Sequence, residues 1–225
     1  EPTGYYCGLD TSDEMRQSYG PTLDGRVKPD VRFPTRTETG CSLSSTCIDL
    51  FGHTSGATPY AAGSALLLYN FFNANGMLPS PGKLYAALVA FGDSMDLPYF
   101  FQNFFGADKV RLGQPSGSRW ITGIRYVSQG ENESFVFPVT GGECDLRAAI
   151  WWPEDASSGG AEIHNDIDLY IEDGAGHTKV SSTDDDSIWE RGHEAGALAA
   201  NGYWRFRIHG ADVVASAQKV YYFLY

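Results

Sequence analysis

The chain has 225 residues, of which 42% are hydrophobic and 14% aromatic, which is enough apolar material for packed domains and too much for a disordered chain. Its 28 acidic residues outnumber its 16 basic ones and leave a formal charge of −12, which argues against binding along a nucleic-acid phosphate backbone. The sequence contains no run of about 18 apolar residues, so we expect no membrane-spanning helix. These properties predict a globular protein that engages neither nucleic acids nor membranes.

The first half of the chain predicts loops followed by two helices. Residues 1–56 are rich in Gly, Pro, Thr and Asp, as is typical of loops between short strands. The first helix should run from about Ser55 to Asn73, with apolar side chains nearly all round it. That pattern predicts a central, buried helix, in which Gly63 permits the close approach of a neighbour. The second helix has Ser80 as its N-cap and Pro81 at its first position, and it should stop at Gly92.

The second half predicts an all-β domain, after a linker at 113–118. Residues 203–209 alternate between apolar and charged or polar side chains, as expected of a strand with one buried face. Further short runs rich in Val, Ile, Phe, Tyr and Trp are separated by turn residues, at 134–140, 146–152, 166–172 and 219–225. Several such strands within about 100 residues predict an antiparallel β-sandwich.

The cysteines and the N-terminus bear on the compartment. Cys7, Cys41, Cys47 and Cys144 form no CxxC pair, which disfavours a zinc ribbon or a thioredoxin-like site. Cys41 and Cys47 bracket a polar loop that a short disulfide would close; two free thiols are the alternative. Cys7 and Cys144 would pair only if the first segment packs on the second half. The chain begins at Glu1 without a signal peptide, from which we expect a processed product or a fragment.

A serine stands at the predicted start of the first helix, in the segment Gly52-His53-Thr54-Ser55. The N-terminus of a helix presents free backbone N–H groups and the positive end of the helix dipole. A hydroxyl at that place can attack a carbonyl whose developing oxyanion is held by those N–H groups. From these residues alone, Thr54 or Ser55 as an ordinary N-cap is the competing interpretation.

A second segment lies upstream of this one. Residues 20–30 read GPTLDGRVKPD, and residues 52–63 read GHTSGATPYAAG. Together the two blocks resemble the subtilisin-like serine proteases (subtilases), in which a "GPT-DG-R-KPD" stretch precedes a "GTS-ATP--AG" nucleophile block. The resemblance continues at residues 83–90 and 105–110. It extends more loosely to the C-terminal jelly-roll domain of some bacterial subtilases, through residues 149–153 and 165–171.

The resemblance implies a fold and an activity. Residues 1–118 would be the C-terminal part of an α/β subtilisin-like parallel-sheet domain, and residues 119–225 an all-β antiparallel sandwich of jelly-roll type. The protein would be a secreted serine endopeptidase that hydrolyses polypeptides through an acyl-enzyme on Ser55. The segment 52–55 would form the active-site loop, and the Ser55 N–H would donate to the oxyanion.

The other catalytic groups of the family precede its serine block. The 54 residues before Ser55 contain no Asn and one histidine, His53, which is poorly placed to act as the base. We therefore expect the catalytic Asp and His and the oxyanion Asn to lie upstream of Glu1, in another part of the same catalytic domain. The alternative hypothesis is a non-catalytic, degenerate subtilase scaffold that acts with its sandwich as a binding or adhesion module.

Two residues of the serine block depart from the family pattern. His53 stands where the family usually has Gly, so a positive φ there would be tolerated with strain, and the side chain would crowd the acyl site. Gly56 stands where many members carry a larger residue, often Met, which would open space beside the nucleophile.

Carboxylates in the second half suggest a calcium site. Asp166 and Asp168 share one face of a predicted strand. With Asn165 and a carboxylate from Asp184, Asp185, Asp186, Glu190 or Glu194, they would offer the hard oxygen ligands that calcium prefers. A solvated outer strand face is the alternative, and the family resemblance favours calcium. No metal-binding spacing is evident among the remaining histidines, which we interpret as surface or turn residues: His164, His177, His193 and His209.

Overall fold

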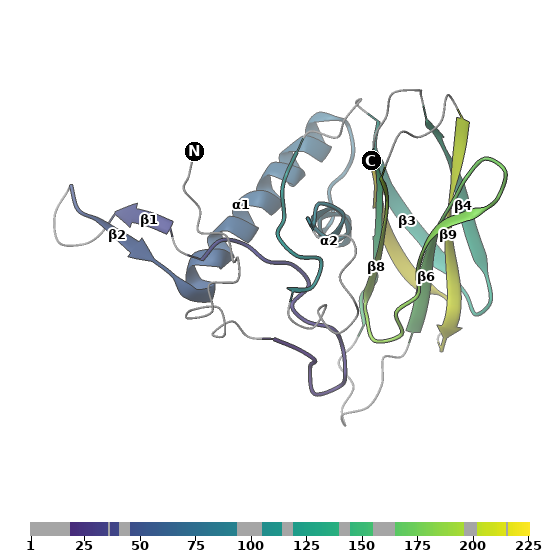
Figure 1. Ribbon diagram of the computed structural model, residues 1–225, viewed down its shortest axis with the longest axis horizontal. Coiled ribbons are helices and arrows are strands. Elements are labelled where there is room, and N and C mark those ends of the chain that lie inside the picture. The colour runs from purple at the N-terminus through teal and green to yellow at the C-terminus, as the bar shows by residue number, and fades with distance from the viewer. Residues whose placement is uncertain are drawn as a thin grey trace.

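The chain, in a computed structural model, is described at residues 19–35, 37–40, 46–93, 105–113, 119–139, 145–154, 165–195, 202–214 and 216–225. Two short strands and two helices precede eight strands: β1 (Thr37–Gly40), β2 (Ile48–Phe51), α1 (His53–Ala74), α2 (Pro81–Ala90), β3 (Ile121–Val127), β4 (Asn132–Val139), β5 (Asp145–Trp151), β6 (Asn165–Glu172), β7 (Thr178–Ser182), β8 (Trp189–Ala195), β9 (Gly202–Val213) and β10 (Gln218–Leu224). Figure 1 shows both helices on one side of the sandwich.

The second half forms the predicted antiparallel β-sandwich. One sheet has the order β3-β10-β5-β8 and the other β4-β9-β6-β7, with antiparallel neighbours throughout. Successive strands change sheet at each step except from β6 to β7, which gives the order of an eight-stranded jelly roll. The predicted runs correspond to β4, β5, β6, β9 and β10. Strands β3, β7 and β8 have no counterpart among the predictions.

The core between the two sheets follows the alternation read from the sequence. In β9, Trp204, Phe206 and Ile208 are buried, whereas the intervening side chains face outward. Phe206 meets Phe137 of β4 edge-to-face, with ring centroids 6.1 Å apart. On β10, Tyr222 stacks on Phe135 across the sandwich at 4.6 Å. The Tyr222–Phe135 contact joins the two sheets, whereas Phe206 and Phe137 are neighbours within one sheet, and both pairs add apolar burial that stabilises the domain.

Helix α2 packs on the outer face of the β3-β10-β5-β8 sheet. Its N-cap is Ser80 with Pro81 at the first helical position, as predicted. Gly82 allows close approach, because a Cβ atom there would lie 2.3 Å from the ring of Tyr221. One turn further on, Tyr85 stacks on Trp151 with ring centroids 4.7 Å apart. The sheet is therefore apolar on both faces, one covered by the second sheet and the other by α2.

Helix α1 is less buried than its composition suggests. Only Gly56, Leu68 and Phe72 are buried among its residues, whereas Leu67 is 63% exposed. Phe72 reaches the sandwich, where it contacts Trp120 and Phe223 at centroid distances of 5.5 and 5.8 Å. The prediction of a central helix is thus wrong for the described chain, because α1 packs along one side and no described element covers the opposite side.

The parallel sheet expected in the first half is represented, among the described residues, by a single parallel bridge between Arg32 and Lys109. Strands β1 and β2 form a separate antiparallel hairpin. Hydrogen bonds to backbone carbonyls connect the described parts of the two halves. The Arg147 and Arg191 guanidiniums donate to the carbonyls of Gly92 (3.3 Å) and Ala107 (2.8 Å), and the N–H of Val27 donates to the Asp186 carbonyl.

The helices and the sandwich share one buried core that runs from Val27 through α1 and α2 to Leu224. The predicted domain boundary between residues 118 and 119 follows the segment 114–118, which lies outside the described residues, and it stays a prediction. Neither helix in the described part of the chain combines the length and the apolar character needed to cross a membrane.

The α2 contact gives a first test with two glycine substitutions. Gly82→Ala should lower the free energy of unfolding by about 1–3 kcal/mol, because the new methyl group overlaps the Tyr221 ring. Gly63→Ala, in α1, should raise it by about 0.5–1 kcal/mol, because nothing lies within 4 Å of its Cβ position and Ala favours the helix. Because no described atom lies within 4 Å of the Gly63 Cβ position, the predicted close approach of a neighbour at Gly63 is wrong. Urea unfolding measures both; unchanged stability of Gly82→Ala would contradict the packing of α2.

Candidate functional site

Ser55 lies in the first turn of α1. The N-cap is Gly52, with extended backbone and no side-chain capping bond, so the interpretation of Thr54 or Ser55 as the cap is wrong. The N–H of Gly56 donates to the Gly52 carbonyl over 3.1 Å and begins the helical bonding pattern. The N–H of Ser55 precedes that bond and lies among the N-terminal donors that a helix leaves unpaired. The Ser55 residue is exposed, so its hydroxyl and this N–H lie together at the helix start.

His53, the first residue of α1, has a left-handed backbone with φ of +61°. The positive φ named as a condition in the sequence analysis is thus present, and the crowding of the acyl site by His53 stays a prediction. A residue with a Cβ atom adopts this region at a cost, because the Cβ crowds its own carbonyl oxygen. The first turn therefore stores strain two residues before Ser55, with the imidazole exposed to solvent.

Gly56, the residue after Ser55, is buried. A Cβ atom at this position would lie 2.5 Å from the Thr35 carbonyl oxygen and 3.1 Å from that of Phe51. The expectation that Gly56 opens space beside Ser55 is therefore wrong, because backbone fills that space. This contact instead fixes the start of α1 against the chain that follows the GPTLDGRVKPD stretch.

The carboxylates of that stretch are engaged in ion pairs of their own. Asp24 pairs with Arg26 at 2.8 Å, and the hydrogen bonds from Arg26 and Thr22 lower the pKa of Asp24 to about 2. Asp30 pairs with Lys28 at 2.6 Å. In the described part of the chain, no imidazole or carboxylate is hydrogen-bonded to the Ser55 hydroxyl.

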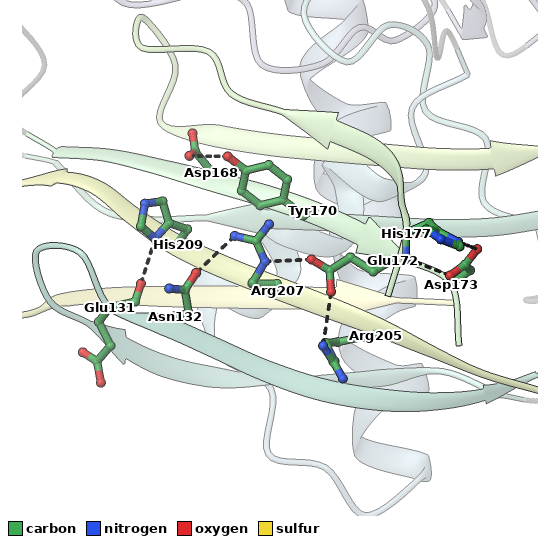
Figure 2. A network of polar contacts seen from close by, with 10 residues as sticks. All are labelled: Glu131, Asn132, Asp168, Tyr170, Glu172, Asp173, His177, Arg205, Arg207 and His209. Atoms are coloured by element: carbon green, nitrogen blue, oxygen red, sulfur yellow. Dashed lines mark hydrogen bonds and ion pairs between the residues drawn. The ribbon is translucent and has the colours of Figure 1, made fainter. Parts of the chain in front are cut away.

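Of the predicted calcium ligands, Asp166 and Asp168 lie on the outer face of the β4-β9-β6-β7 sheet. Asp168 is buried, and its Oδ2 accepts a 2.8 Å hydrogen bond from the Tyr170 hydroxyl (Figure 2). Next to them Arg207 lies over the Tyr170 ring at 3.8 Å and donates to Glu172 at 2.9 Å. Asn165 lies on the opposite face, because its Nδ2 donates to Oε1 of Gln218 in the other sheet at 3.2 Å, and its Oδ1 accepts from the Val214 N–H at 3.0 Å. It is thus bound elsewhere and does not join Asp166.

A loop between β7 and β8 gathers further carboxylates. Asp184, Asp185 and Asp186 offer ligand oxygens that all lie within 4.8 Å of one another. Glu190, 1% exposed, accepts from the Asp184 N–H at 3.1 Å and from the Ser182 hydroxyl. Two carboxylate oxygens here, Oδ1 of Asp166 and Oδ2 of Asp184, are shielded from solvent and have no hydrogen-bond partner among the described residues.

Electrostatics connects Asp166 to this loop. Burial raises the pKa of Asp166 to about 6, and the charges of Asp168, Asp185, Asp212 and Asp184 add to the effect. Burial likewise raises the pKa of Asp184 to about 6, and that of Glu190 well above its usual range. Buried carboxylates that repel one another are neutralised by a cation or by protons. Their oxygens are the hard donors that calcium takes, so the residues fit that ion.

The remaining predicted residues have separate outcomes. Cys47 is disulfide-bonded, but the other three cysteines lie outside the described residues, so its pairing with Cys41 stays a prediction. His177 lies in the β6–β7 turn, 3.2 Å from Asp173, and His209 lies 3.2 Å from the Glu131 carbonyl (Figure 2). His164 lies outside the described residues.

His193 is not the surface residue that we expected. Its side chain is 15% exposed and hydrogen-bonds to Asp145, which also accepts from Arg147 at 2.9 Å. The sequence carries no signal for this contact, because it depends on the register in which β5 and β8 pair. The cluster holds the end of the sheet beside α2 and Gly92.

Comparison with known proteins bears on the first half of the chain. Residues 14–89 match the model of the subtilase family, a segment that includes the GPTLDGRVKPD stretch, Ser55 and most of α2. This match supports a relation to the subtilases. Among solved structures, the chain is similar to PliG of Aeromonas hydrophila, a periplasmic lysozyme inhibitor of g-type lysozyme, at 13% identity over 50% of this chain and 89% of that one. The TM-score is 0.27, and that similarity carries no argument about fold or function.

The backbone of His53 gives a second prediction. His53→Gly should raise the free energy of unfolding by about 1 kcal/mol, because glycine adopts a positive φ without the Cβ clash. Thr54→Gly, one residue further into the helix, should lower it by about 0.5 kcal/mol, because glycine there only adds unfolded-state entropy. Urea unfolding of the two variants distinguishes them. Destabilisation by both would show that His53 is not strained.

Proposed function

We propose that this chain carries the nucleophile segment of a secreted subtilisin-like serine endopeptidase. The observation that carries the proposal is the place of Ser55, exposed in the first turn of α1, within the segment that matches the subtilase family. The substrate class is a polypeptide, in keeping with that family relation. The sandwich packs on α2, the helix that follows α1, and so supports the segment.

The reaction follows from the groups at this helix end. Ser55 Oγ attacks the scissile carbonyl carbon as a histidine base takes its proton, and the carbonyl oxygen becomes an oxyanion that accepts from the Ser55 N–H. Collapse of the tetrahedral intermediate expels the protonated amine and leaves an acyl-enzyme. Water, activated by the same base, then hydrolyses the ester and restores Ser55.

The base, the aspartate that orients it and the oxyanion asparagine are proposed to come from sequence N-terminal to this chain. In support, Asp24 and Asp30 are bound in ion pairs, and His53 stands on the first turn itself with an exposed side chain. The helix end therefore supplies the serine nucleophile and one oxyanion donor, and the upstream sequence would supply the base, the aspartate and the second oxyanion donor.

The third prediction concerns a fluorophosphonate probe, which labels activated serines. A longer protein that includes the upstream groups should be labelled at Ser55, and Ser55→Ala should remove the label. This chain alone should not react measurably, because loss of triad members costs roughly 10⁶-fold in turnover in subtilisin. Asp24→Asn is a control. The Asp24 carboxylate is bound to Arg26 and has no proposed catalytic role, so this variant should still be labelled. Strong labelling of the isolated chain would contradict the proposal, and an unreactive longer protein would favour the non-catalytic binding module.

We also propose that the sandwich binds calcium through Asp166 and Asp168 together with the β7–β8 loop. The solvent-shielded, unpartnered oxygens of Asp166 and Asp184 support this, as do the three neighbouring carboxylates of residues 184–186. The ion would supply the positive charge that these groups lack and would hold β6 to the loop. Its role is structural, since the site lies on the sandwich.

The fourth prediction is that chelation lowers the melting temperature by about 5–10 °C. The estimate takes roughly 2.7 kcal/mol from a ligand at 100 times its Kd and about 2–4 °C per kcal/mol for a chain of this size. Asp166→Ala should abolish the response to chelator, and Asp168→Ala tests the second proposed ligand. Glu133→Gln serves as the control, because Glu133 pairs with Arg125 at 3.3 Å. If chelator leaves the melting temperature of the wild-type chain unchanged, the calcium site is wrong.

A further inference from the structure

The outer face of the β4-β9-β6-β7 sheet lies on the side of the sandwich away from both helices (Figure 1). Strand β9 lies inside this sheet, between β4 and β6, and its outward side chains are those of Tyr203, Arg205, Arg207 and His209. Tyr203 is 66% exposed, and the Arg205 side chain is 52% exposed. The outward row of β9 therefore presents guanidinium groups and an aromatic ring to solvent.

Arg207 is held in place from three sides (Figure 2). Its guanidinium lies 3.8 Å from the ring centroid of Tyr170, Nε donates to Oε1 of Glu172 at 2.9 Å, and Nη1 donates to Oδ1 of Asn132 at 3.1 Å. In the described part of the chain, no residue accepts from its remaining N–H groups, which are the donors that bind carboxylates. Because the guanidinium is already fixed, a ligand that binds it loses little side-chain freedom.

The charges at this end of the face lie in two layers. The Glu172 carboxylate is shared, because Oε2 lies 3.5 Å from Nη1 of Arg205 while Oε1 accepts from Arg207. The Glu172 side chain is 9% exposed, against 52% for Arg205 and 24% for Arg207. One covered carboxylate beneath two more exposed guanidiniums leaves positive charge outermost, on a chain whose formal charge is −12. Such a patch is complementary to an anionic partner.

The other end of the same face is acidic. Asp168 pairs in register with His209, and Asp166 with Asp212, at the end of β9 away from Tyr203. Like charges repel an anionic ligand there. An anionic partner is thereby confined to the end of the face that bears the two arginines.

The spacing of the arginines matches an extended peptide. Alternate residues of a strand are about 6.6 Å apart, and an extended peptide has the same repeat. Two acidic side chains separated by one residue can therefore reach Arg205 and Arg207 together. Carboxylates bind guanidinium groups through strong, charge-assisted hydrogen bonds. The exposed Tyr203 ring, next in the row, offers apolar contact to the following part of the peptide.

We propose that the outward row of β9 from Tyr203 to Arg207 is a binding site for an acidic polypeptide. The polypeptide lies extended along β9, with Asp or Glu side chains two residues apart against the arginines. Arg207 is the fixed anchor, and Arg205 is the more exposed second contact. The site goes beyond the proposed peptidase activity and depends neither on Ser55 nor on calcium.

Fluorescence anisotropy of the full chain tests the site with a labelled peptide of Gly-Glu repeats and a matched peptide of Gly-Gln repeats. Chelator is present in every sample, so that a bound metal ion does not alter the charge of the face. The Gly-Glu peptide should bind, and its affinity should fall at least about tenfold when salt is raised from about 0.05 M to about 0.5 M, because salt screens exposed charges. The Gly-Gln peptide should bind at least about tenfold more weakly, because it lacks the carboxylates.

Three variants place the binding on this face. Arg205→Gln should weaken the Gly-Glu peptide at least about fivefold at an unchanged melting temperature, because its side chain is exposed and its ion pair is long. Arg207→Lys keeps the charge and loses the planar fork that bonds Glu172 and Asn132, so it should weaken binding similarly. Arg111→Gln is the matched control, because it removes the same charge from a 59% exposed arginine in the other half of the chain.

Weaker binding in both face variants, with the control unchanged, supports the site. The proposal is overturned if the wild-type chain does not bind the Gly-Glu peptide, or if Arg111→Gln weakens binding as much as the face variants do. Equal binding of the Gly-Gln peptide or of a neutral xylan fragment would show that the face recognises uncharged polymers, which also overturns it. Displacement of the peptide by an equal concentration of inorganic phosphate would show a site for any anion and would overturn the assignment to a polypeptide.

Discussion

The packing of α2 against the β3-β10-β5-β8 sheet is the contact on which the rest of the structure depends. Gly82 brings the helix backbone onto the Tyr221 ring, and Tyr85 extends the contact by stacking on Trp151. Both faces of this sheet are thereby buried, whereas the other sheet presents a polar outer face around Arg207 and Glu172. The helix also joins the two halves into one core, so the segment that bears Ser55 is supported by strands that follow it in sequence.

The elements that sequence reasoning found are those in which one local pattern decides the structure. The alternation at 203–209 predicts β9, and Ser80-Pro81 predicts the start of α2. Strand β8 is not predicted by its sequence. It buries an acidic residue, Glu190, and Gly192 interrupts its apolar pattern. Helix α1 is more exposed than predicted. Its apolar composition shows that it can be buried, but burial depends on neighbouring elements, which the sequence of α1 does not reveal.

In the candidate site, too, local features could be predicted from the sequence, whereas features that depend on tertiary packing could not. The place of Ser55 at the start of α1 follows from the motif, because a helix start is a local feature, whereas the positive φ of His53 could be stated from the sequence only as a condition. The acidic loop was named only as a possible extra ligand. The effect of its charges on the pKa of Asp166 and its hydrogen bond to Val27 depend on tertiary packing. The same holds for the space behind Gly56, which the Thr35 backbone fills and which no pattern near Ser55 reveals.

The position of β10 has a consequence for how the protein is made. This strand is the last in sequence, yet it lies in the interior of its sheet between β3 and β5, and its Phe223 ring contacts both Phe72 of α1 and Phe91 at the end of α2. Chains emerge from the ribosome N-terminus first, so the docking surface for both helices is incomplete until residues 218–224 have been synthesised. The serine-bearing segment thus acquires its support only after translation has passed the sandwich, which delays the docking of α1 and α2 until the chain through Leu224 is available.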